Sequence, residues 1–199
     1  MICSKQDLRE YIEADQNALG GVQLKQKIKS LFVPAVWKFQ KKMRICEYYA
    51  NCRHDYFGKL LFQLKYLSYE RYGRKLGFDI GLNVFGKGLC ICHPGTIVIS
   101  YKAKFGEFAR IHAGVNVGNY SRNLDDDDKS PTFGNNVYIG PGAKIFGKIN
   151  IGNDVAIGAN AVVSRDVPDH VTVAGSPAKT INDIGSEGLI RGRERCTIS

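Results

Sequence analysis

The sequence lacks several features that define common protein classes. No apolar run approaches the roughly 18 residues of a membrane span, and the first seven residues turn polar too soon for a signal peptide. The six cysteines show neither paired zinc-site spacing nor a secreted disulfide framework. Cys90 and Cys92 lie two apart in an extended stretch and face one side, too constrained for an easy disulfide. We therefore expect reduced thiols and a cytoplasmic protein.

The 199-residue chain has a formal net charge of +9, which is concentrated at one end. Residues 1–78 have a net charge of +8, against +1 for residues 79–199. A basic, solvent-facing helical surface explains this bias, and attraction to an anionic substrate or weak contact with a membrane surface is the alternative. No recognition motif accompanies the charge, so we expect no nucleic-acid partner.

Residues 1–78 are expected to form an α-helical cap. Ser4 followed by Asp7 predicts a capped helix over 5–18, which Gly20 and Gly21 end. Apolar residues at helical spacing predict two further helices, over 36–49 and 56–72, after an interruption at Pro34. Aromatic side chains are expected to form the core of this cap, with a ligand-binding aromatic box as the alternative. They are Trp37, Phe39, Tyr48, Tyr49, Phe57, Phe62 and Tyr66.

The second half of the chain repeats every six residues. An aliphatic or aromatic residue returns at each sixth position, a small residue often follows it, and Ala or Val often occupies the fifth position. The large residues are Ile99, Phe105, Ile111, Val117, Phe133, Ile139, Ile145, Ile151, Ile157 and Val163. Neither a helix nor a simple strand has this period, whereas a left-handed parallel β-helix of hexapeptide repeats does. We expect a mainly β fold over 79–181 and a tail over 182–199.

Residues 119–132 break the repeat. They include four consecutive aspartates, Asp125–Asp128, which a packed coil would not tolerate. Val117 and Phe133 are sixteen residues apart, which is not a multiple of six. We expect a loop that leaves the β-helix, either with a functional role or as a solvated acidic tip.

Two of the four histidines are expected to lie close together. His93 stands at the start of the repeats and His112 follows nineteen residues later, whereas one coil takes about eighteen residues. The two should therefore occupy neighbouring coils near the same part of the triangle and could share one cleft. A solvated surface histidine is the alternative for His112.

Three segments resemble the serine O-acetyltransferase branch of the hexapeptide-repeat acyltransferases. They are 79–98, 137–147 and 174–179, with the short members of surface-polysaccharide gene clusters as the most similar group. The resemblance covers 79–181 well and 1–78 loosely. It implies a trimer with acetyl-CoA bound between neighbouring subunits. It also implies that a histidine removes the proton from an acceptor hydroxyl, which attacks the thioester directly.

Site residues follow from the same resemblance. His93 matches the catalytic base, and Asp79 matches the carboxylate that orients it; a buried carboxylate would fix the imidazole tautomer and stabilise the imidazolium. Small residues match positions against which the pantetheine arm lies, and Lys179 matches a basic residue near the CoA phosphates. The small residues are Gly140, Pro141, Gly158 and Ala159, and the alternative for each glycine is a simple corner turn.

The acceptor site departs from the family pattern. Cys92 replaces an aspartate before the catalytic histidine, Ser130 replaces a histidine before Pro131, and Gly20-Gly21 replace an Asp-Pro pair. We expect none of these replacements to be charged, whereas bound free serine would need charged partners. The sequence therefore favours a sugar hydroxyl of a capsular or exopolysaccharide, bound by His112, Cys92 and Ser130. Free serine is the alternative acceptor.

Two hypotheses come from other classes. A β-helix without catalytic activity, acting as a scaffold or sugar-binding protein, should need neither Asp79 nor His93. A metalloenzyme needs three metal-binding histidines that converge between subunits, and only His93 and His112 are suitably placed. We therefore expect no metal.

Overall fold

The computed structural model describes residues 1–21, 34–119 and 130–190. Helices α1 (Lys5–Ala18), α3 (Ala35–Cys52) and α4 (Tyr56–Leu76) precede all described strands. The strands are β1 (Phe78–Ile80), β2 (Cys90–Ile91), β3 (Ile97–Ile99), β4 (Lys104–Phe105), β5 (Arg110–Ile111), β6 (Asn116–Gly118), β7 (Thr132–Phe133), β8 (Tyr138–Ile139), β9 (Lys144–Phe146), β10 (Asn150–Ile151), β11 (Ala156–Ile157), β12 (Val162–Val163), β13 (Thr172–Gly175) and β14 (Ala178–Asn182).

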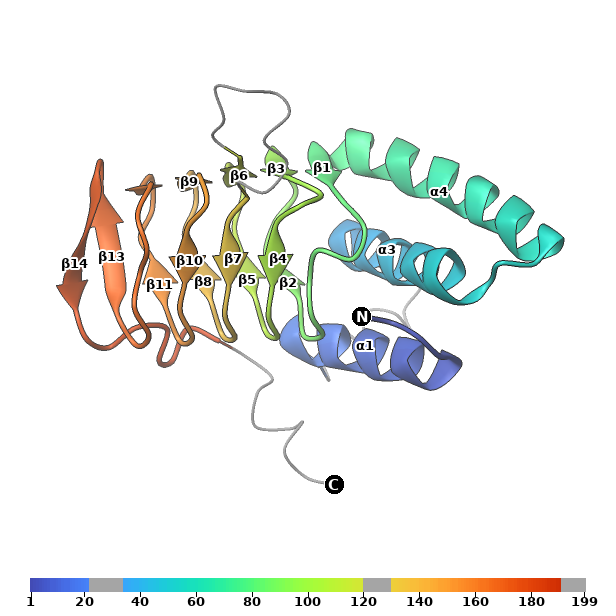
Figure 1. Cartoon of the computed structure of the whole chain (residues 1–199), viewed down its shortest axis with the longest axis horizontal. Helices are drawn as coiled ribbons and strands as arrows, with labels where there is room; N and C mark the ends of the chain where they lie inside the picture. Colours follow the sequence, from blue (N-terminus) through green and yellow to red (C-terminus); the bar gives the residue numbers. More distant parts are fainter. Residues whose placement is uncertain (22–33, 120–129, 191–199) are drawn as a thin grey trace.

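The strands stack as the coils of a parallel β-helix (Figure 1). One sheet has the order β1-β3-β6-β9-β12, a second β10-β7-β4, and a third β14-β13-β11-β8-β5-β2. All neighbouring strands are parallel except β13 and β14, which close the far end as an antiparallel pair. Successive strands from β1 to β13 thus fall in different sheets, so each middle coil takes one strand from each face.

The six-residue repeat sets the core. All ten large residues of the repeat are at most 7% exposed, and the Ala or Val at the fifth positions is buried as well. Identical side chains lie over one another along the axis, as in the stacked rings of Phe105 and Phe133, whose centroids are 3.9 Å apart. Each coil therefore buries its apolar residues only with the help of its neighbours. The predicted β-helix is confirmed.

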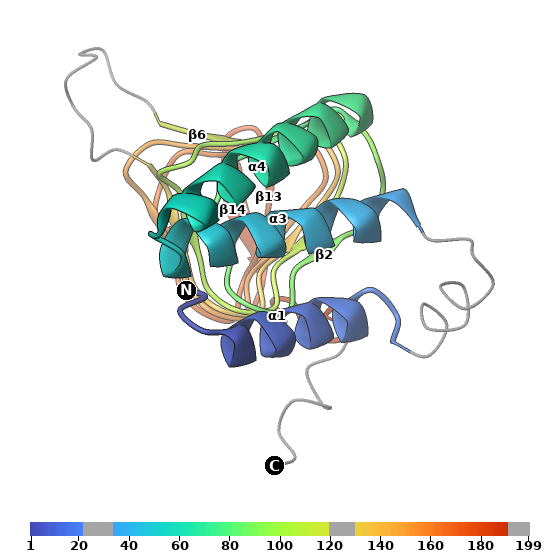
Figure 2. The ribbon, with the colours of Figure 1, turned by 90° about the vertical axis from the view of Figure 1, so that its right-hand side faces the viewer.

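The three helices lie across the first coil, as the view along the stack shows (Figure 2). Helix α1 has the predicted bounds and the predicted cap, in which Asp7 N donates to Ser4 Oγ at 3.0 Å and Cys3 N donates to Asp7 Oδ2 at 2.8 Å. The aromatic core is confirmed at Trp37, Phe39 and Tyr48, which are buried.

The expectation is wrong for Phe57, which is 70% exposed. It belongs to an outward face of α4 that no described residue covers, because only the opposite face of this helix packs on α3. Other exposed apolar side chains of this face are Tyr56, Leu60, Leu61, Leu64 and Leu67.

Polar side chains of the cap pair with the open edges of the first coil. Gln40 on α3 donates to Leu89 O at 2.7 Å and accepts from Ile91 N at 3.2 Å, as a strand would. Arg44 donates to Phe85 O and Gly86 O, and Tyr69 on α4 donates to Ile80 O. These contacts satisfy backbone groups that would otherwise be buried without partners.

Buried charge supports the same junction. Arg44 is fully buried and donates to Asp15 at 2.8 Å and to Glu47 at 3.0 Å. Burial alone would lower the pKa of Arg44, but the two carboxylates raise it overall. Asp15 also accepts from Leu89 N, and Glu47 accepts from Asn83 N, both at 2.8 Å.

Other predictions lie at the limits of what the structure describes. The loop expected over 119–132, with Asp125–Asp128, falls mostly outside the described residues, as does the end of the tail over 182–199. Among the described helices, none combines the length and the apolar character needed to cross a membrane. The division into a cap over 1–78, a β-helix over 79–181 and a tail stays a prediction.

Candidate active site

One edge of the β-helix gathers most of the predicted site residues. Cys92 and His112 directly follow β2 and β5, and Gly140 and Gly158 directly follow β8 and β11, all in the same sheet. Backbone hydrogen bonds join them coil by coil: Cys92 N to Ile111 O, His112 N to Ile139 O, Gly140 N to Ile157 O and Gly158 N to Val173 O. The four residues therefore form one column.

A polar cluster occupies the cap end of this column. Cys92 Sγ lies 3.4 Å from His112 Nε2, and Arg110 Nε donates to Cys92 Sγ at 3.3 Å. The rings of His93 and His112 have centroids 6.2 Å apart, which confirms that the two histidines share one part of the triangle. Tyr138, one coil further, lies edge-on to His112 at 5.2 Å.

The cluster holds Cys92 as a thiolate. A hydrogen bond from Cys90 lowers the pKa of Cys92 to about 5, with further lowering by Arg110, while partial burial acts in the opposite direction. Partial burial also lowers the pKa of His112, despite the thiolate nearby. Since a thiolate has no proton to give, a neutral His112 must donate from Nε2, which leaves its Nδ1 as a hydrogen-bond acceptor.

This charge corrects one premise of the sequence analysis. Cys92 was expected to be an uncharged replacement for an aspartate, but near pH 7 its sulfur is negative. The position therefore keeps an anion, although Arg110 already compensates part of its charge.

The predicted base, His93, and its predicted carboxylate partner, Asp79, lie on different strands or turns and are both exposed. His93 is exposed just after β2, and Asp79 lies in β1 beside Val98 of β3. Asp79 was expected to be buried, but its side chain points away from the core and is exposed, in the pattern buried, exposed, buried along β1. Among the described residues no hydrogen bond joins Asp79 to His93, so their pairing stays a prediction.

Ser130 lies at another corner of the triangular β-helix. It precedes β7, and its Oγ is 3.3 Å from Ser100 Oγ, at the end of β3. The chain alone does not bring Ser130 beside Cys92 and His112, which stand between β2 and β3 or between β5 and β6.

The candidate CoA-binding residues share the edge with the histidines. Pro141 and Ala159 are exposed there, next to Gly140 and Gly158. A Cβ added at Gly140 would lie 2.8 Å from Ala159 N, and one at Gly158 would lie 2.9 Å from Ala174 Cβ, so coil stacking alone already requires small residues. Lys179 is exposed on β14 at the far end. No described group of side chains could hold a metal ion.

Arg110, Tyr138 and Cys90 are site neighbours that the sequence analysis missed. Each stands one position before an inward isoleucine of the same sheet. Arg110 precedes Ile111, Tyr138 precedes Ile139, and Cys90 precedes Ile91. The register of the repeat therefore contained the signal, because residues at equal positions in successive coils must stack.

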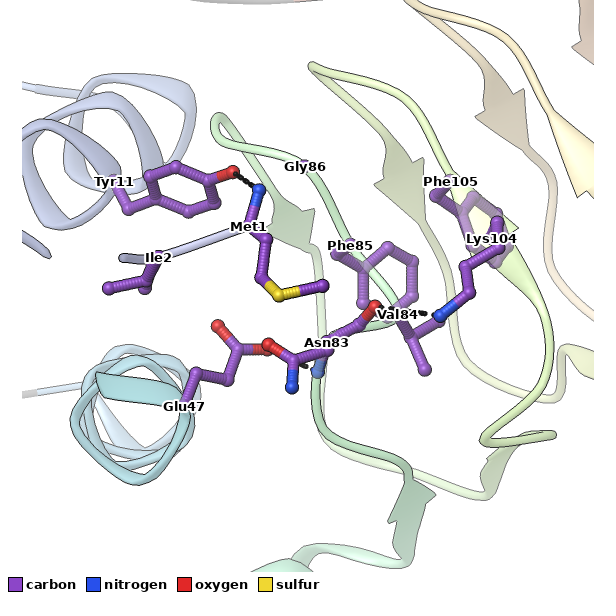
Figure 3. Close-up of a pocket in the computed structure, with 10 residues that line it drawn as sticks. All are labelled: Met1, Ile2, Tyr11, Glu47, Asn83, Val84, Phe85, Gly86, Lys104 and Phe105. Carbon is purple, nitrogen blue, oxygen red and sulfur yellow. Dashed lines mark hydrogen bonds between the residues drawn. The ribbon is translucent and has the colours of Figure 1, made fainter. Parts of the chain in front are cut away.

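The structure also contains a cavity of about 240 Å³ between the cap and the first coil (Figure 3). Its polar lining includes Tyr11, Glu47 and Lys104, and Phe85 forms part of its wall. None of the predicted site residues lines it, so the cavity belongs to the junction and not to the histidine edge.

No family model matches the sequence. Solved structures with this architecture show that the fold is a left-handed β-helix with an N-terminal helical region. The serine acetyltransferase of Neisseria gonorrhoeae superposes with a TM-score of 0.72 and 28% identity, over 90% of this chain and 68% of that one.

A serine acetyltransferase in complex with CoA gives a TM-score of 0.70 and 25% identity, over 89% of this chain and 71% of that chain. In sequence, the serine acetyltransferase of Helicobacter pylori is 44% identical over 96 residues, which cover 48% of this chain and 55% of the relative. The chain spans about half the length of the curated relatives it matches. It is thus similar to serine acetyltransferases in fold over most of its length and in sequence over about half of it.

Proposed function

We propose that the protein is an acetyl-CoA-dependent O-acetyltransferase. The observation that carries this proposal is the set of residues gathered along one edge of the β-helix. His93 and His112 stand 6.2 Å apart on neighbouring coils, beside the small residues Gly140 and Gly158, in a chain similar to serine acetyltransferases. A non-catalytic scaffold would not require this grouping of imidazoles and a thiolate.

The proposed reaction is direct transfer. His93 removes the proton from the acceptor hydroxyl, whose oxygen attacks the carbonyl carbon of the acetyl thioester, and the CoA thiolate leaves. His93 is suited to this step because a neutral imidazole accepts a proton near pH 7. Asp79 would orient His93, and His112 would accept a hydrogen bond from the acceptor at Nδ1. Gly140, Pro141, Gly158, Ala159 and Lys179 would contact CoA.

Free serine is the better supported acceptor. The relatives are named serine acetyltransferases, and the Neisseria gonorrhoeae enzyme has been solved in complex with serine. These comparisons favour the alternative of the sequence analysis over its first choice, a polysaccharide hydroxyl. The negative charge on Cys92 agrees with serine, because it offers a partner for an ammonium group where no charge was expected.

A saccharide hydroxyl is the second candidate. Ser130, which stands where the family has a histidine, is neutral and already contacts Ser100. A sugar would need no counter-charge there. The short relatives of polysaccharide gene clusters belong to this hypothesis.

We also propose a homotrimer, or a multiple of three, in the cytoplasm where acetyl-CoA is used. Exposed Asp79 and His93 agree with a site that a neighbouring subunit completes, and the apolar outward face of α4 agrees with further contacts. Weak contact of the basic cap with a membrane surface remains part of this proposal. A stable, active monomer in sedimentation would refute the shared site.

The test is release of free CoA thiol from acetyl-CoA with serine or with a panel of saccharides. We expect release with serine, and a decrease of about 10²–10⁴-fold in His93→Ala, the usual contribution of a positioned base. CoA affinity should change little. His54→Ala, at an exposed position of the cap, is the matched control. Release with a saccharide but not with serine would make the saccharide, and not serine, the proposed acceptor. Wild-type turnover in His93→Ala would refute the mechanism.

A further inference from the structure

We propose that Cys92 is an oxidation site: its sulfur attacks hydrogen peroxide, and the neighbouring Cys90 resolves the oxidised product as a disulfide. The site lies within the candidate active site, so its effect on acetyl transfer rests on the proposed function. The oxidation itself does not, because it needs only the geometry of the thiol cluster.

The cluster supplies the groups that make a cysteine reactive. Arg110 donates from Nε to Cys92 Sγ at 3.3 Å, and His112 Nε2 lies 3.4 Å from the same sulfur. Arg110 is itself held in place, because its Nη1 donates to Leu189 O at 2.7 Å. Cys92 is only half-buried, so small reagents can reach it. A cationic donor such as Arg110 beside a partly exposed sulfur is typical of the surroundings of reactive thiolates.

Cys46 and Cys52 lack these surroundings. Cys46 is buried in the cap, and burial raises its pKa to about 12. Burial, although slight, also raises the pKa of Cys52. Cys92, in contrast, has its pKa lowered to about 5, so near pH 7 almost all of it is thiolate. The chain therefore contains a reactive thiol and unreactive ones that serve as internal controls.

The chemistry balances with peroxide as the oxidant. The Cys92 thiolate attacks one oxygen of hydrogen peroxide, the O–O bond breaks, and the departing hydroxide takes a proton to become water. Cys92 is then a sulfenic acid. The Cys90 sulfur attacks the Cys92 sulfur, an S–S bond forms, and the hydroxyl leaves as a second water with the Cys90 proton. Two thiols lose two electrons, and one peroxide becomes two waters.

Cys90 is suited to the second step. It stands two residues before Cys92, on the same outward side, and its thiol hydrogen-bonds to Cys92. A disulfide between residues so close along a strand is strained and therefore easily reduced. The constraint that made an easy disulfide unexpected from the sequence thus predicts a bond that dithiothreitol reopens readily.

The first experiment is alkylation of the full chain with iodoacetamide, followed peptide by peptide by mass spectrometry. At pH 6 a thiol with a pKa of about 5 exceeds an ordinary thiol of about 8.5 in thiolate by about 300-fold, and its lower nucleophilicity removes about 40-fold of this advantage. We expect Cys92 to react roughly tenfold faster than exposed Cys3, and Arg110→Gln to reduce this ratio. Equal rates at the two cysteines would overturn the proposal.

The second experiment adds hydrogen peroxide, with dimedone to trap sulfenic acid. Wild type should yield a Cys90–Cys92 disulfide that dithiothreitol reverses, and Cys90→Ser should accumulate the dimedone adduct on Cys92. An unchanged adduct level in Cys90→Ser would overturn the resolving role of Cys90. Oxidation of Cys3 or Cys46 before Cys92 would overturn the oxidation site itself.

A third arm measures acetyl transfer after peroxide. Wild type and the control Cys3→Ser should lose activity in step with Cys92 oxidation and regain it with dithiothreitol. Loss of activity without Cys92 oxidation would contradict the link to the active site. A chain that transfers no acetyl group to any acceptor refutes the proposed function, while the two labelling experiments still decide the oxidation site.

Discussion

The helical cap and the β-helix solve the problem of burial in opposite ways. The β-helix uses one apolar device repeatedly, with inward residues such as Ile111 and Ile139 stacked coil on coil. The cap uses polar contacts that each occur once: Gln40, Arg44 and Tyr69 each meet a different part of the first coil. A repeat cannot supply these contacts, because its first coil has no neighbour on one side.

The difference has energetic consequences. Losing an apolar side chain from a coil leaves a cavity but no unpaired charge, and the neighbouring coils keep their hydrogen bonds. Losing Arg44 would leave Asp15 and Glu47 as buried carboxylates, together with two backbone carbonyls that lose their donor. The junction is therefore expected to be the more sensitive of the two regions.

Arg44→Ala is expected to have the largest effect on stability. Breaking a buried ion pair by removing one partner costs about 3–5 kcal/mol, because the remaining charge stays buried. Denaturant unfolding would measure the loss, and hydrogen exchange would locate it. The Leu89 amide, which donates to Asp15, should exchange faster than the Gly158 amide, which lies in the middle of the coils.

Arg53→Ala is the matched control for that variant. Arg53 pairs with Asp55 at 2.9 Å, but both side chains are substantially exposed, so solvent screens the pair and the change should cost little stability. Equal losses in the two variants would contradict the view that the junction depends on buried charge.

Ile139→Ala tests the repeated device. Ile139 is fully buried in β8, between β5 and β11, and its truncation should cost about 2–5 kcal/mol. Tyr138→Ala, at the adjacent outward position, should cost less because that side chain is only half-buried. A larger loss in Ile139→Ala than in Arg44→Ala would reverse the ranking of the two regions.

The same comparison explains what the sequence could predict. Period six is visible because every coil repeats it, so the ten inward residues and the nearness of His93 and His112 followed from counting. The junction depends on unique long-range pairs, such as Arg44 with Asp15 and Gln40 with Leu89, which no local pattern contains. The burial of Asp79 was predicted wrongly for a different reason: alternation along β1 turns its side chain outward, whereas the family resemblance suggested a buried carboxylate.

The charge of Cys92 shows a further limit. A residue type alone gives a neutral thiol near pH 7, and only the placement of Cys90, Arg110 and His112 around the sulfur makes it an anion. Arg110 stands eighteen residues away, one coil further, at a position whose residue type the repeat does not restrict. The sequence shows an arginine at this position, but its contact with Cys92 appears only when the coils are stacked.

Ser4→Ala should have a smaller effect than Arg44→Ala or Ile139→Ala, and it tests whether local structure within the cap matters apart from the junction. Ser4 Oγ accepts from Asp7 N at the start of α1, and Asp7 returns the contact by accepting from Cys3 N. Loss of such a cap costs about 0.5–2 kcal/mol. Asp15 lies near the C-terminal end of α1, far from the Ser4 cap. Fraying of the first turn should therefore leave Asp15 in place in the buried network. Exchange at the Asp7 amide should therefore rise while exchange at the Leu89 amide stays unchanged, and a rise at both would mean that the cap and the junction form one cooperative unit.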